Sequence, residues 1–193
     1  DRVWNGDPQP ASGSVCMNEA IVHANRGIHI QQPLATTTHP PLAMAESWED
    51  DGFTLWESGA VMRYLCAEYS MGELYPQNLR ARAAADKWMD WSSINLAPFN
   101  GVYLEEILQK SAAERDELRL AAAIKQAGLM YDILDAHLVD NDYMCGEKLT
   151  MADFPLGSLT DRWINWTPNR PSHPNVEAYY ERLASRPAYR QHV

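Results

Sequence analysis

The spacing of apolar residues changes along the chain and predicts two kinds of structure. Before residue 57 the apolar segments are short and are separated by turn-rich stretches, a pattern typical of strands. The segments with strand composition are 2–4, 28–30, 45–49 and 53–56. Residues 12–24 predict a helix between the first two strands, and Gly27 would end it.

The strongest local signal is Asp51-Gly52, between the segments 45–49 and 53–56. Asp-Gly readily supplies the positive φ angles of a tight turn, so the two segments are predicted to form an antiparallel hairpin. Directly afterwards Ser58 can cap a helix. The apolar residues of that helix recur at helical spacing: Val61, Met62, Leu65, Cys66 and Tyr69.

After Pro76 nearly every apolar pattern has a helical period. Pro98 would bend or end the first helix, and Pro187 would end the last one before a short tail. The helices expected in this part are 81–95, 120–138 and 175–183. We therefore expect an α/β domain over residues 1–72, a linker over 73–79 and an all-helical domain over 80–193.

Thr150 and Asp153 have the spacing of a capping box. In such a box Thr150 accepts a hydrogen bond from the backbone N–H of Asp153, and the Asp153 carboxylate reaches back to the N–H of Thr150. A capping residue contributes about 0.5–2 kcal/mol to helix stability. We assign both residues to folding and not to catalysis.

Composition excludes several functional classes. The net charge of −10 is unlike the basic surface of nucleic-acid-binding proteins, so no nucleic-acid partner is expected. Three widely spaced cysteines indicate neither a disulfide framework nor a zinc ribbon, and the six histidines form no metal-binding pair. No apolar run has the length of a membrane span, and no secretory leader is recognisable, so we expect a cytoplasmic protein without a metal or a membrane partner.

Three segments in the same order resemble soluble glutathione transferases of the bacterial type. They are residues 50–65, 146–153 and 182–189, which read DDGFTLWESGAVMRYL, GEKLTMAD and RLASRPAY. The resemblance implies an α/β thioredoxin-like N-terminal domain followed by an all-α helical-bundle C-terminal domain. It also implies a homodimer that conjugates glutathione, its co-substrate, to small and largely apolar electrophiles in detoxification.

Glu57 and Ser58 match the residues with which this family binds glutathione. The resemblance implies that Ser58 holds the γ-glutamyl carboxylate and that Glu57 faces the ammonium group. Independently, a hydroxyl at a helix start, beside free N–H groups and the positive end of the helix dipole, suits a carboxylate. The alternative is that Ser58 only caps its helix.

The family activates the glutathione sulfur at the turn before its first helix, since the thiolate is the reactive form. Here Ser12 is the first choice because Asp7-Pro8 followed by Ser12-Gly13 resembles the serine-type turn of bacterial members. Ser14 and Cys16 are the alternatives. Ser12 could also serve only as a helix cap.

The stretch before Glu49 departs from the family, whose cis-proline presents backbone to the glutathione cysteine. Counting back from Asp50, that position falls on Glu46, which makes Ala45 and Glu46 the matching glutathione contacts. A cis bond before a residue other than proline costs about 2.5–4 kcal/mol. Either Pro40 or Pro41 therefore takes the role, or the contact is absent.

Four aromatic residues are candidates for the electrophile pocket, because the family places that pocket beside the first helix of the C-terminal domain. They are Trp88, Trp91, Tyr103 and Trp163. The alternative for each is a place in the hydrophobic core. Two other functions also fit the sequence. One is a non-catalytic binding or regulatory dimer, and the other is a glutathione-dependent thiol-disulfide reductase, which would need a reactive Cys16.

Overall fold

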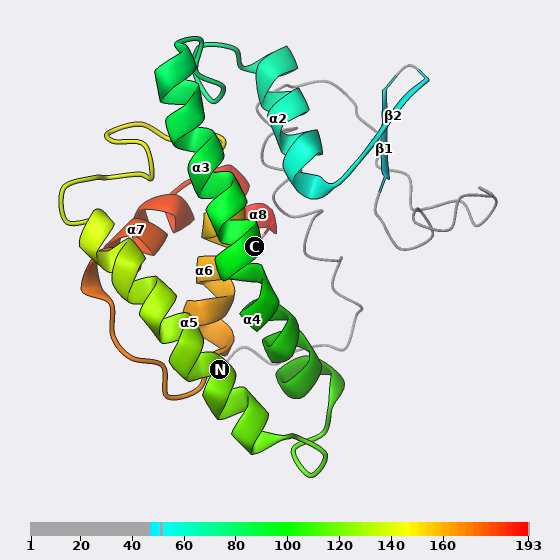
Figure 1. The fold of residues 1–193 in the computed structure, drawn as a ribbon, viewed down its shortest axis with the longest axis vertical. Helices are drawn as coiled ribbons and strands as arrows, with labels where there is room; N and C mark the ends of the chain where they lie inside the picture. The colour runs from blue at the N-terminus through cyan, green and yellow to red at the C-terminus, as the bar shows by residue number, and fades with distance from the viewer. Residues whose placement is uncertain (1–46, 51, 193) are drawn as a thin grey trace.

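The computed structural model describes residues 47–50 and 52–192, and Figure 1 shows their arrangement. The strands β1 (Ser47–Asp50) and β2 (Phe53–Trp56) pair antiparallel, with Ser47 opposite Trp56. Gly52, at the turn between them, has a φ of 86°, which a residue without a Cβ adopts easily. The predicted hairpin is confirmed. Helix α2 (Ser58–Tyr69) follows directly, as its apolar spacing predicts.

The rest of the described chain is helical, also as predicted. Its helices are α3 (Leu79–Asn95), α4 (Ala97–Tyr103), α5 (Glu117–His137), α6 (Asp153–Trp166), α7 (Pro174–Ala184) and α8 (Pro187–His192). A π-helical segment, Leu104–Gln109, continues α4. Pro98 lies in the first turn of α4, where its missing N–H has no intrahelical partner to lose. The predicted short tail was wrong, because Pro187 begins α8 instead of ending the helical structure.

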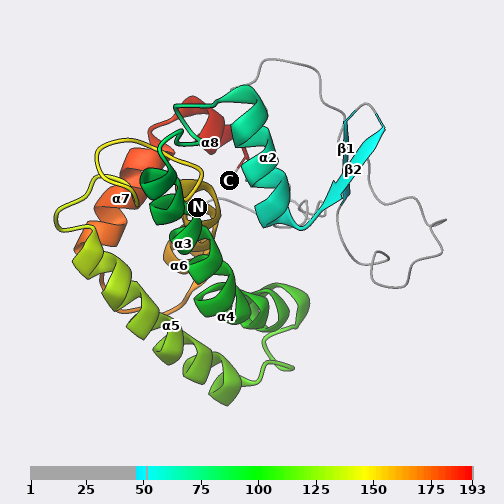
Figure 2. The same ribbon diagram turned by 45° about the horizontal axis from the view of Figure 1, so that its top comes forward.

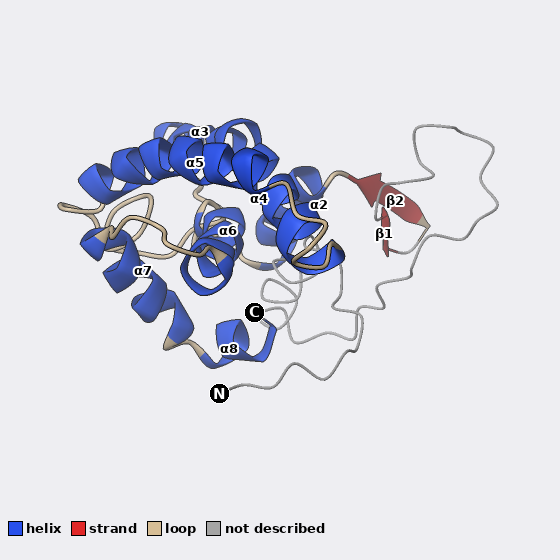
Figure 3. Ribbon diagram, turned by 90° about the horizontal axis from the view of Figure 1, so that it is seen from below, coloured by secondary structure: helices blue, strands red, loops and turns tan. Residues whose placement is uncertain are grey.

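Helix α6 is the centre of the helical part. It contacts α3 and α4 on one side and α7 on the other, and Figure 3 shows it between these groups. Along α6 the side chains of Phe154, Leu156 and Trp163 are buried. The Trp163 ring stacks on that of Tyr131 from α5, with 4.5 Å between ring centroids. The buried residues of α6 also include Ser158, Thr160 and Arg162, so the other helices enclose polar as well as apolar positions of this helix.

Gly157 lets α7 and α8 approach α6 closely. A Cβ at this position would lie 2.8 Å from the Leu183 side chain and 3.1 Å from the Tyr189 ring. Tyr189 Oη donates a hydrogen bond of 2.7 Å to the Gly157 carbonyl. The last helix is therefore anchored on the central one, and Figure 2 shows α8 beside α7 at this end of the molecule.

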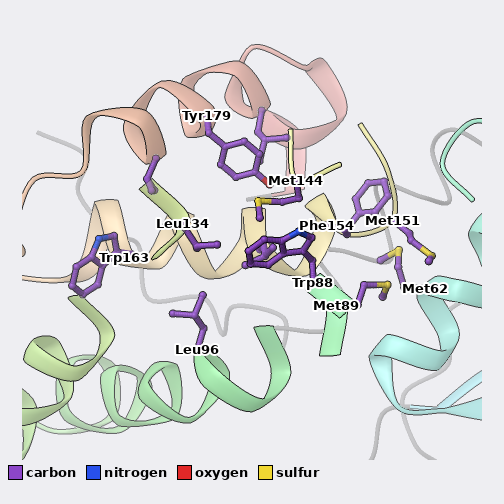
Figure 4. Packing of buried hydrophobic residues seen from close by; sticks show 14 of the residues in the cluster. Met62, Trp88, Met89, Leu96, Leu134, Met144, Met151, Phe154, Trp163 and Tyr179 are labelled. Carbon is purple, nitrogen blue, oxygen red and sulfur yellow. The ribbon is translucent and has the colours of Figure 1, made fainter. Parts of the chain in front are cut away.

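Methionines join α2 to the helical part. Met62 of α2, Met89 of α3 and Met151 before α6 are all buried, and Figure 4 shows them near one another. Methionine has flexible rotamers and fills irregular gaps, which suits a junction between differently oriented helices. In addition, Met151 donates its backbone N–H to the Leu74 carbonyl across 2.9 Å.

The start of α6 uses the predicted residues in a different arrangement. Asp153 Oδ2 accepts the backbone N–H of Thr150 at 2.8 Å, as expected. The backbone N–H of Asp153 bonds to the carbonyl oxygen of Thr150, not to its side chain. The Thr150 hydroxyl instead contacts the Asp153 carboxylate at 3.3 Å. Half of the capping box is confirmed, and the half in which the Thr150 side chain caps Asp153 was wrong.

Candidate functional site

The chain enters α2 through an unusual backbone conformation at Glu57, which has a φ of 70° and a ψ of 113°. Positive φ is rare for a residue other than glycine, and such conformations gather at binding and active sites. The Glu57 carbonyl accepts the N–H groups of Ala60 and Val61 at 2.9 and 3.0 Å. Glu57, not Ser58, is thus the N-cap residue, and the prediction that Ser58 caps the helix was wrong.

Ser58 is the first residue of α2, and its side chain is exposed. The first N–H groups of an α-helix have no acceptor within the helix, and the helix dipole places partial positive charge there. Because the helix does not use the Ser58 hydroxyl as a cap, that hydroxyl is available to a ligand. The start of α2 thus offers several hydrogen-bond donors to an anion.

Ser58 lines a cavity of about 160 Å³ between α2, α3, α4 and α6. Its wall mixes hydroxyl, amide and guanidinium groups with apolar side chains. The described lining residues are Ser58, Gly59, Met62, Arg63, Met89, Ser92, Ser93, Ala97, Asn100, Pro155, Ser158, Leu159 and Arg162. An engineered cavity of about 150 Å³ holds a benzene molecule, so this one suits a group of similar size.

Arg63 connects the cavity to the helical part of the molecule. Its Nε donates to Asp86 Oδ1 and its Nη2 to Asp90 Oδ1, both at 2.6 Å. Its Nη1 also reaches the Gly59 carbonyl at 3.4 Å. These bonds attach α2 to α3, two of the helices that line the cavity.

The predicted aromatic pocket residues do not line this cavity. Trp163 is 0% exposed and Tyr103 is 3% exposed, so both belong to the core. Trp88 is also buried and packs edge-on against the half-buried Trp91 at 5.4 Å between ring centroids. The alternative interpretation of these residues, a place in the core, is the one that this structure supports. They were misassigned because the resemblance places the electrophile pocket beside a helix without showing which aromatic side chains face a cavity.

The other predicted site residues lie outside the described residues: Ser12, Ser14, Cys16, Ala45 and Glu46. Of the described cysteines, Cys66 is buried, and that burial raises the pKa of its thiol to about 12. Burial also raises the pKa of Cys145. Burial therefore disfavours the reactive thiolate form of both side chains.

Sequence reasoning missed Asn100, Ser158 and Arg162, which come from α4 and α6. A polar residue within a helix normally indicates a solvent-facing position, so spacing carried no signal for them. Arg162 is 7% exposed, and its guanidinium lies over the Trp166 ring at 5.4 Å. Only the packing of α6 against α3 and α4 brings these three residues to one wall.

Comparison with known proteins decides the family. A profile for the C-terminal domain of glutathione S-transferase matches residues 96–187. Glutathione S-transferase GstB of Escherichia coli K12 is 30% identical over 149 residues, which cover 75% of this chain and 70% of GstB. The chain belongs to the glutathione S-transferase family. The predicted family and enzyme class, a glutathione transferase, are confirmed.

Solved structures of this family have the same fold. The theta class glutathione S-transferase of Xanthomonas axonopodis pv. citri is 32% identical, with a TM-score of 0.83, and the match covers 94% of this chain and 91% of that one. One of its structures has glutathione bound. Poplar glutathione transferase F1, at 19% identity and a TM-score of 0.81, shares the fold. The predicted fold class, a thioredoxin-like domain followed by a helical bundle, is confirmed.

Within the part of the chain that the structure describes, no helix has both the length and the apolar character to cross a membrane. The same residues contain no group of three or more histidine, cysteine or acidic side chains placed to hold a metal ion.

Proposed function

We propose that this glutathione transferase conjugates glutathione to small electrophiles and holds the γ-glutamyl end of glutathione at Glu57 and Ser58. The observation that supports this most is the position of Ser58, in the first turn of a 12-residue helix and on the wall of a cavity. Family membership supplies glutathione as the co-substrate.

The γ-glutamyl end of glutathione carries a carboxylate and an ammonium group. The donors at the start of α2 suit the carboxylate, because hydrogen bonds to a charged group contribute about 1.5–3 kcal/mol. The exposed Glu57 carboxylate suits the ammonium group. The positive φ of Glu57 supports this role, since a strained conformation is maintained where function requires it.

The thiol must be activated from the N-terminal part of the chain. Ser12 remains our first choice for a hydroxyl that stabilises the thiolate, with Ser14 and Cys16 as the alternatives. In conjugation the sulfur forms a bond to the electrophile while the leaving group departs with its electron pair, and the thiol proton passes to solvent. The family also supports action as a homodimer, which light scattering on the purified protein would check.

Calorimetric titration with glutathione tests the role of Ser58. We expect Ser58→Ala to weaken glutathione binding about tenfold, since it removes a hydrogen bond to a carboxylate. Ser70→Ala is the matched control, because Ser70 lies at the opposite end of the same helix and outside the cavity. Binding by Ser58→Ala as tight as native binding would refute the assignment.

Steady-state conjugation of a test electrophile separates binding from activation. We expect Ser12→Ala to retain glutathione binding and to lose most of its kcat. Ser14→Ala and Cys16→Ala should keep kcat if Ser12 is the activating group. A chain that binds no glutathione at millimolar concentration would contradict the proposed function as a whole.

A further inference from the structure

We propose that the cavity beside Ser58 receives a compact, neutral electrophile that carries an N–H or O–H donor, and that Asn100 selects for that donor. This inference rests on the proposed function, because Ser58 lines the same cavity. It makes Asn100 a specificity-determining residue of the proposed reaction, and it adds one chemical feature, a hydrogen-bond donor, to the proposed substrate class.

Asn100 is a polar residue at a position that helix packing encloses. It lies in α4, which contacts α3, α5 and α6, and the residue is 8% exposed. Its Oδ1 atom is buried and has no hydrogen-bond partner among the described residues. A buried acceptor without a partner destabilises the folded protein, and an apolar side chain of similar size would avoid that cost. A donor on a molecule in the cavity would supply the missing hydrogen bond.

Asn100 differs from the other buried polar atoms without a partner in the described structure. Those atoms are Tyr103 Oη, Thr160 Oγ1, Trp163 Nε1 and His173 Nδ1. None of these four residues belongs to the described lining of the cavity, whereas Asn100 does. A molecule in the cavity would therefore meet Asn100 alone among them.

Two serines on the α3 side of the cavity direct their protons away from Asn100. The hydroxyls of Ser92 and Ser93 both donate to the Met89 carbonyl, at 2.7 and 3.2 Å. A serine hydroxyl has one proton and two lone pairs, so each of these two offers a ligand only acceptor capacity. Together with Asn100 Oδ1 they give this part of the lining an excess of acceptors, which suits a donor.

The two arginines of the lining have counter-charges of their own. Arg63 is paired with two aspartates of α3. Arg162 lies over the Trp166 ring and interacts with the Asp161 carboxylate. The proposal therefore needs no charge on the occupant. A neutral N–H or O–H group also loses much less hydration free energy than an ion when it enters a cavity with apolar walls.

The size and the apolar part of the wall limit the rest of the occupant. At about 160 Å³ the cavity accepts a group the size of benzene and excludes a whole tripeptide. The apolar residues of the described lining are Met62, Met89, Ala97, Pro155 and Leu159. The sequence predicted small and largely apolar electrophiles. The cavity favours those with a single aromatic ring and one donor group.

Two electrophiles that differ in one group test the proposal: 4-chloro-3-nitrobenzamide and 4-chloro-3-nitroacetophenone. The NH₂ of the first is a CH₃ of similar size in the second, so both have a carbonyl acceptor and only the benzamide has a donor. With either one, the glutathione sulfur bonds to the ring carbon, chloride leaves with the electron pair of the broken bond, and the thiol proton passes to solvent.

We expect Asn100→Leu to raise KM for the benzamide about fivefold, the effect of one neutral hydrogen bond. KM for the acetophenone and Kd for glutathione should stay unchanged. An equal rise in KM for both electrophiles would show that Asn100 acts on their shared shape or carbonyl, and it would overturn the proposal.

Asn100→Asp separates the acceptor end of the carboxamide from its NH₂ end. Aspartate has nearly the same shape as asparagine and keeps an acceptor oxygen in either protonation state. We expect this variant to retain a lower KM for the benzamide than Asn100→Leu. A KM as high as that of Asn100→Leu would mean that the NH₂ end recognises the substrate, and would overturn the proposal.

Calorimetry with glutathione checks the other possible source of the donor. If Asn100→Leu weakens glutathione binding about fivefold and leaves both electrophile KM values unchanged, Asn100 serves glutathione and the assignment to the electrophile is overturned. Unchanged values for all three ligands would mean that no ligand uses Oδ1, and would overturn it as well.

Thermal melting separates a binding role from a structural one. Asn100→Leu removes a buried acceptor without a partner, so its melting temperature should equal or exceed the native value. Asn95→Leu is the control, because the Asn95 amide donates to the Trp91 carbonyl at 3.0 Å and lies outside the cavity. That variant should melt lower with unchanged kinetics. A lower melting temperature for Asn100→Leu, without a selective effect on the benzamide, would make Asn100 a structural residue and overturn the proposal.

Binding of 4-chloro-3-nitrobenzamide without glutathione keeps this inference separate from the proposed function. A chain that fails to bind glutathione but binds the benzamide, more weakly in Asn100→Leu, would retain the donor-selective cavity and lose the transferase role. A chain that binds glutathione but shows no selective effect at Asn100 would retain the transferase role and lose the donor-selective cavity.

Discussion

Two carboxylates are fully buried in the helical part, and their surroundings differ. Glu106 is 0% exposed and accepts hydrogen bonds from Lys110 Nζ at 2.8 Å, the Asp116 backbone N–H at 2.9 Å and Arg119 Nη1 at 2.7 Å. Asp153 is 1% exposed and has neutral donors only. Both carboxylates are hidden from solvent, but Glu106 has two cations beside it and Asp153 has none.

The pKa values of the two groups move in opposite directions. Hydrogen bonds from Lys110 and from the Asp116 backbone, together with Arg119, lower the pKa of Glu106 to about 2. Burial raises the pKa of Asp153 to about 6, even though four hydrogen bonds favour its charged form. Desolvation is the largest cause for Asp153 and only the third for Glu106, so depth in the protein and the charge of the partners together decide whether an enclosed carboxylate stays ionised.

The two buried carboxylates also connect different parts of the fold. Glu106, in the π-helical segment after α4, is bonded to the residues that begin α5. Asp153 accepts the Met144 N–H at 2.9 Å, the Thr150 N–H and the Tyr179 hydroxyl at 3.1 Å. It therefore joins the loop before α6 to α7, at the start of the central helix.

The largest predicted effect is that of Asp153→Ala. This change leaves the N–H groups of Met144 and Thr150 without their carboxylate acceptor and removes the carboxylate contact of the Tyr179 hydroxyl. At about 1–3 kcal/mol for each unsatisfied buried donor, we expect a loss of about 4 kcal/mol or more in the free energy of unfolding. Urea denaturation at pH 7 measures it. A loss below about 1 kcal/mol would show that these donors find other acceptors.

Glu106→Gln should come next. The introduced carboxamide would keep an acceptor oxygen but no longer neutralise Lys110 and Arg119, so the variant should be less stable than native at pH 7 and more stable than Asp153→Ala. The lowered pKa means that the native stabilisation is complete above the ordinary glutamate pKa and is lost as pH falls toward about 2. Acid titrations followed by circular dichroism should therefore show a shallower transition below about pH 4.5 in Glu106→Gln. Parallel titrations would contradict the role of its charge.

A smaller effect is predicted for Asp153→Asn, and here the stability of the native protein falls, not rises, as the pH increases. The folded-state pKa of Asp153 is raised to about 6. The contribution of Asp153 to the free energy of unfolding is therefore present below about pH 4 and is lost as pH rises through about 6. Native stability should therefore fall relative to Asp153→Asn between these pH values, by about 1.4 kcal/mol per unit of pKa difference. Denaturation at a series of pH values measures this slope. A constant difference between the two proteins would show that Asp153 keeps an ordinary pKa.

The smallest effect is expected for Glu105→Gln. Glu105 contacts the same two cations as Glu106, Lys110 at 3.1 Å and Arg119 at 2.7 Å, but its side chain is 41% exposed. Solvent screens exposed ion pairs, so this neighbouring variant should show the native midpoint in urea denaturation. A loss equal to that of Glu106→Gln would contradict the importance of burial in the comparison.

Much of the fold could be predicted from short segments of the sequence. Asp51-Gly52 identified the hairpin, and the apolar spacing after Ser58 and Leu120 identified α2 and α5. One hydrogen bond at the start of α6 was also predicted correctly, since Asp153 accepts the Thr150 N–H. These features depend on residues a few positions apart, whose geometry follows from the backbone alone.

The candidate site was less readable, and Trp163 shows why. The resemblance suggested Trp163 as a pocket residue with the core as the alternative, and in the structure it is buried and stacks on Tyr131 in the core, not on a cavity wall. No sequence pattern indicated that Asn100 and Arg162 line the cavity, because polar residues within helices usually face solvent. Ser58 was found through its resemblance to the family, and its role remains a prediction.

By itself, the sequence determined the family, the hairpin, helices α2, α3, α5 and α7 in their order, and Ser58 as the candidate ligand-binding residue. Only the tertiary structure decided which side chains share the cavity with Ser58, and which buried carboxylate has cations beside it. The physical reason is the separation along the chain of the residues that interact. Turns, caps and helical periods arise from neighbours along the chain, whereas a cavity wall and the pKa of a buried acid depend on helices that packing brings together.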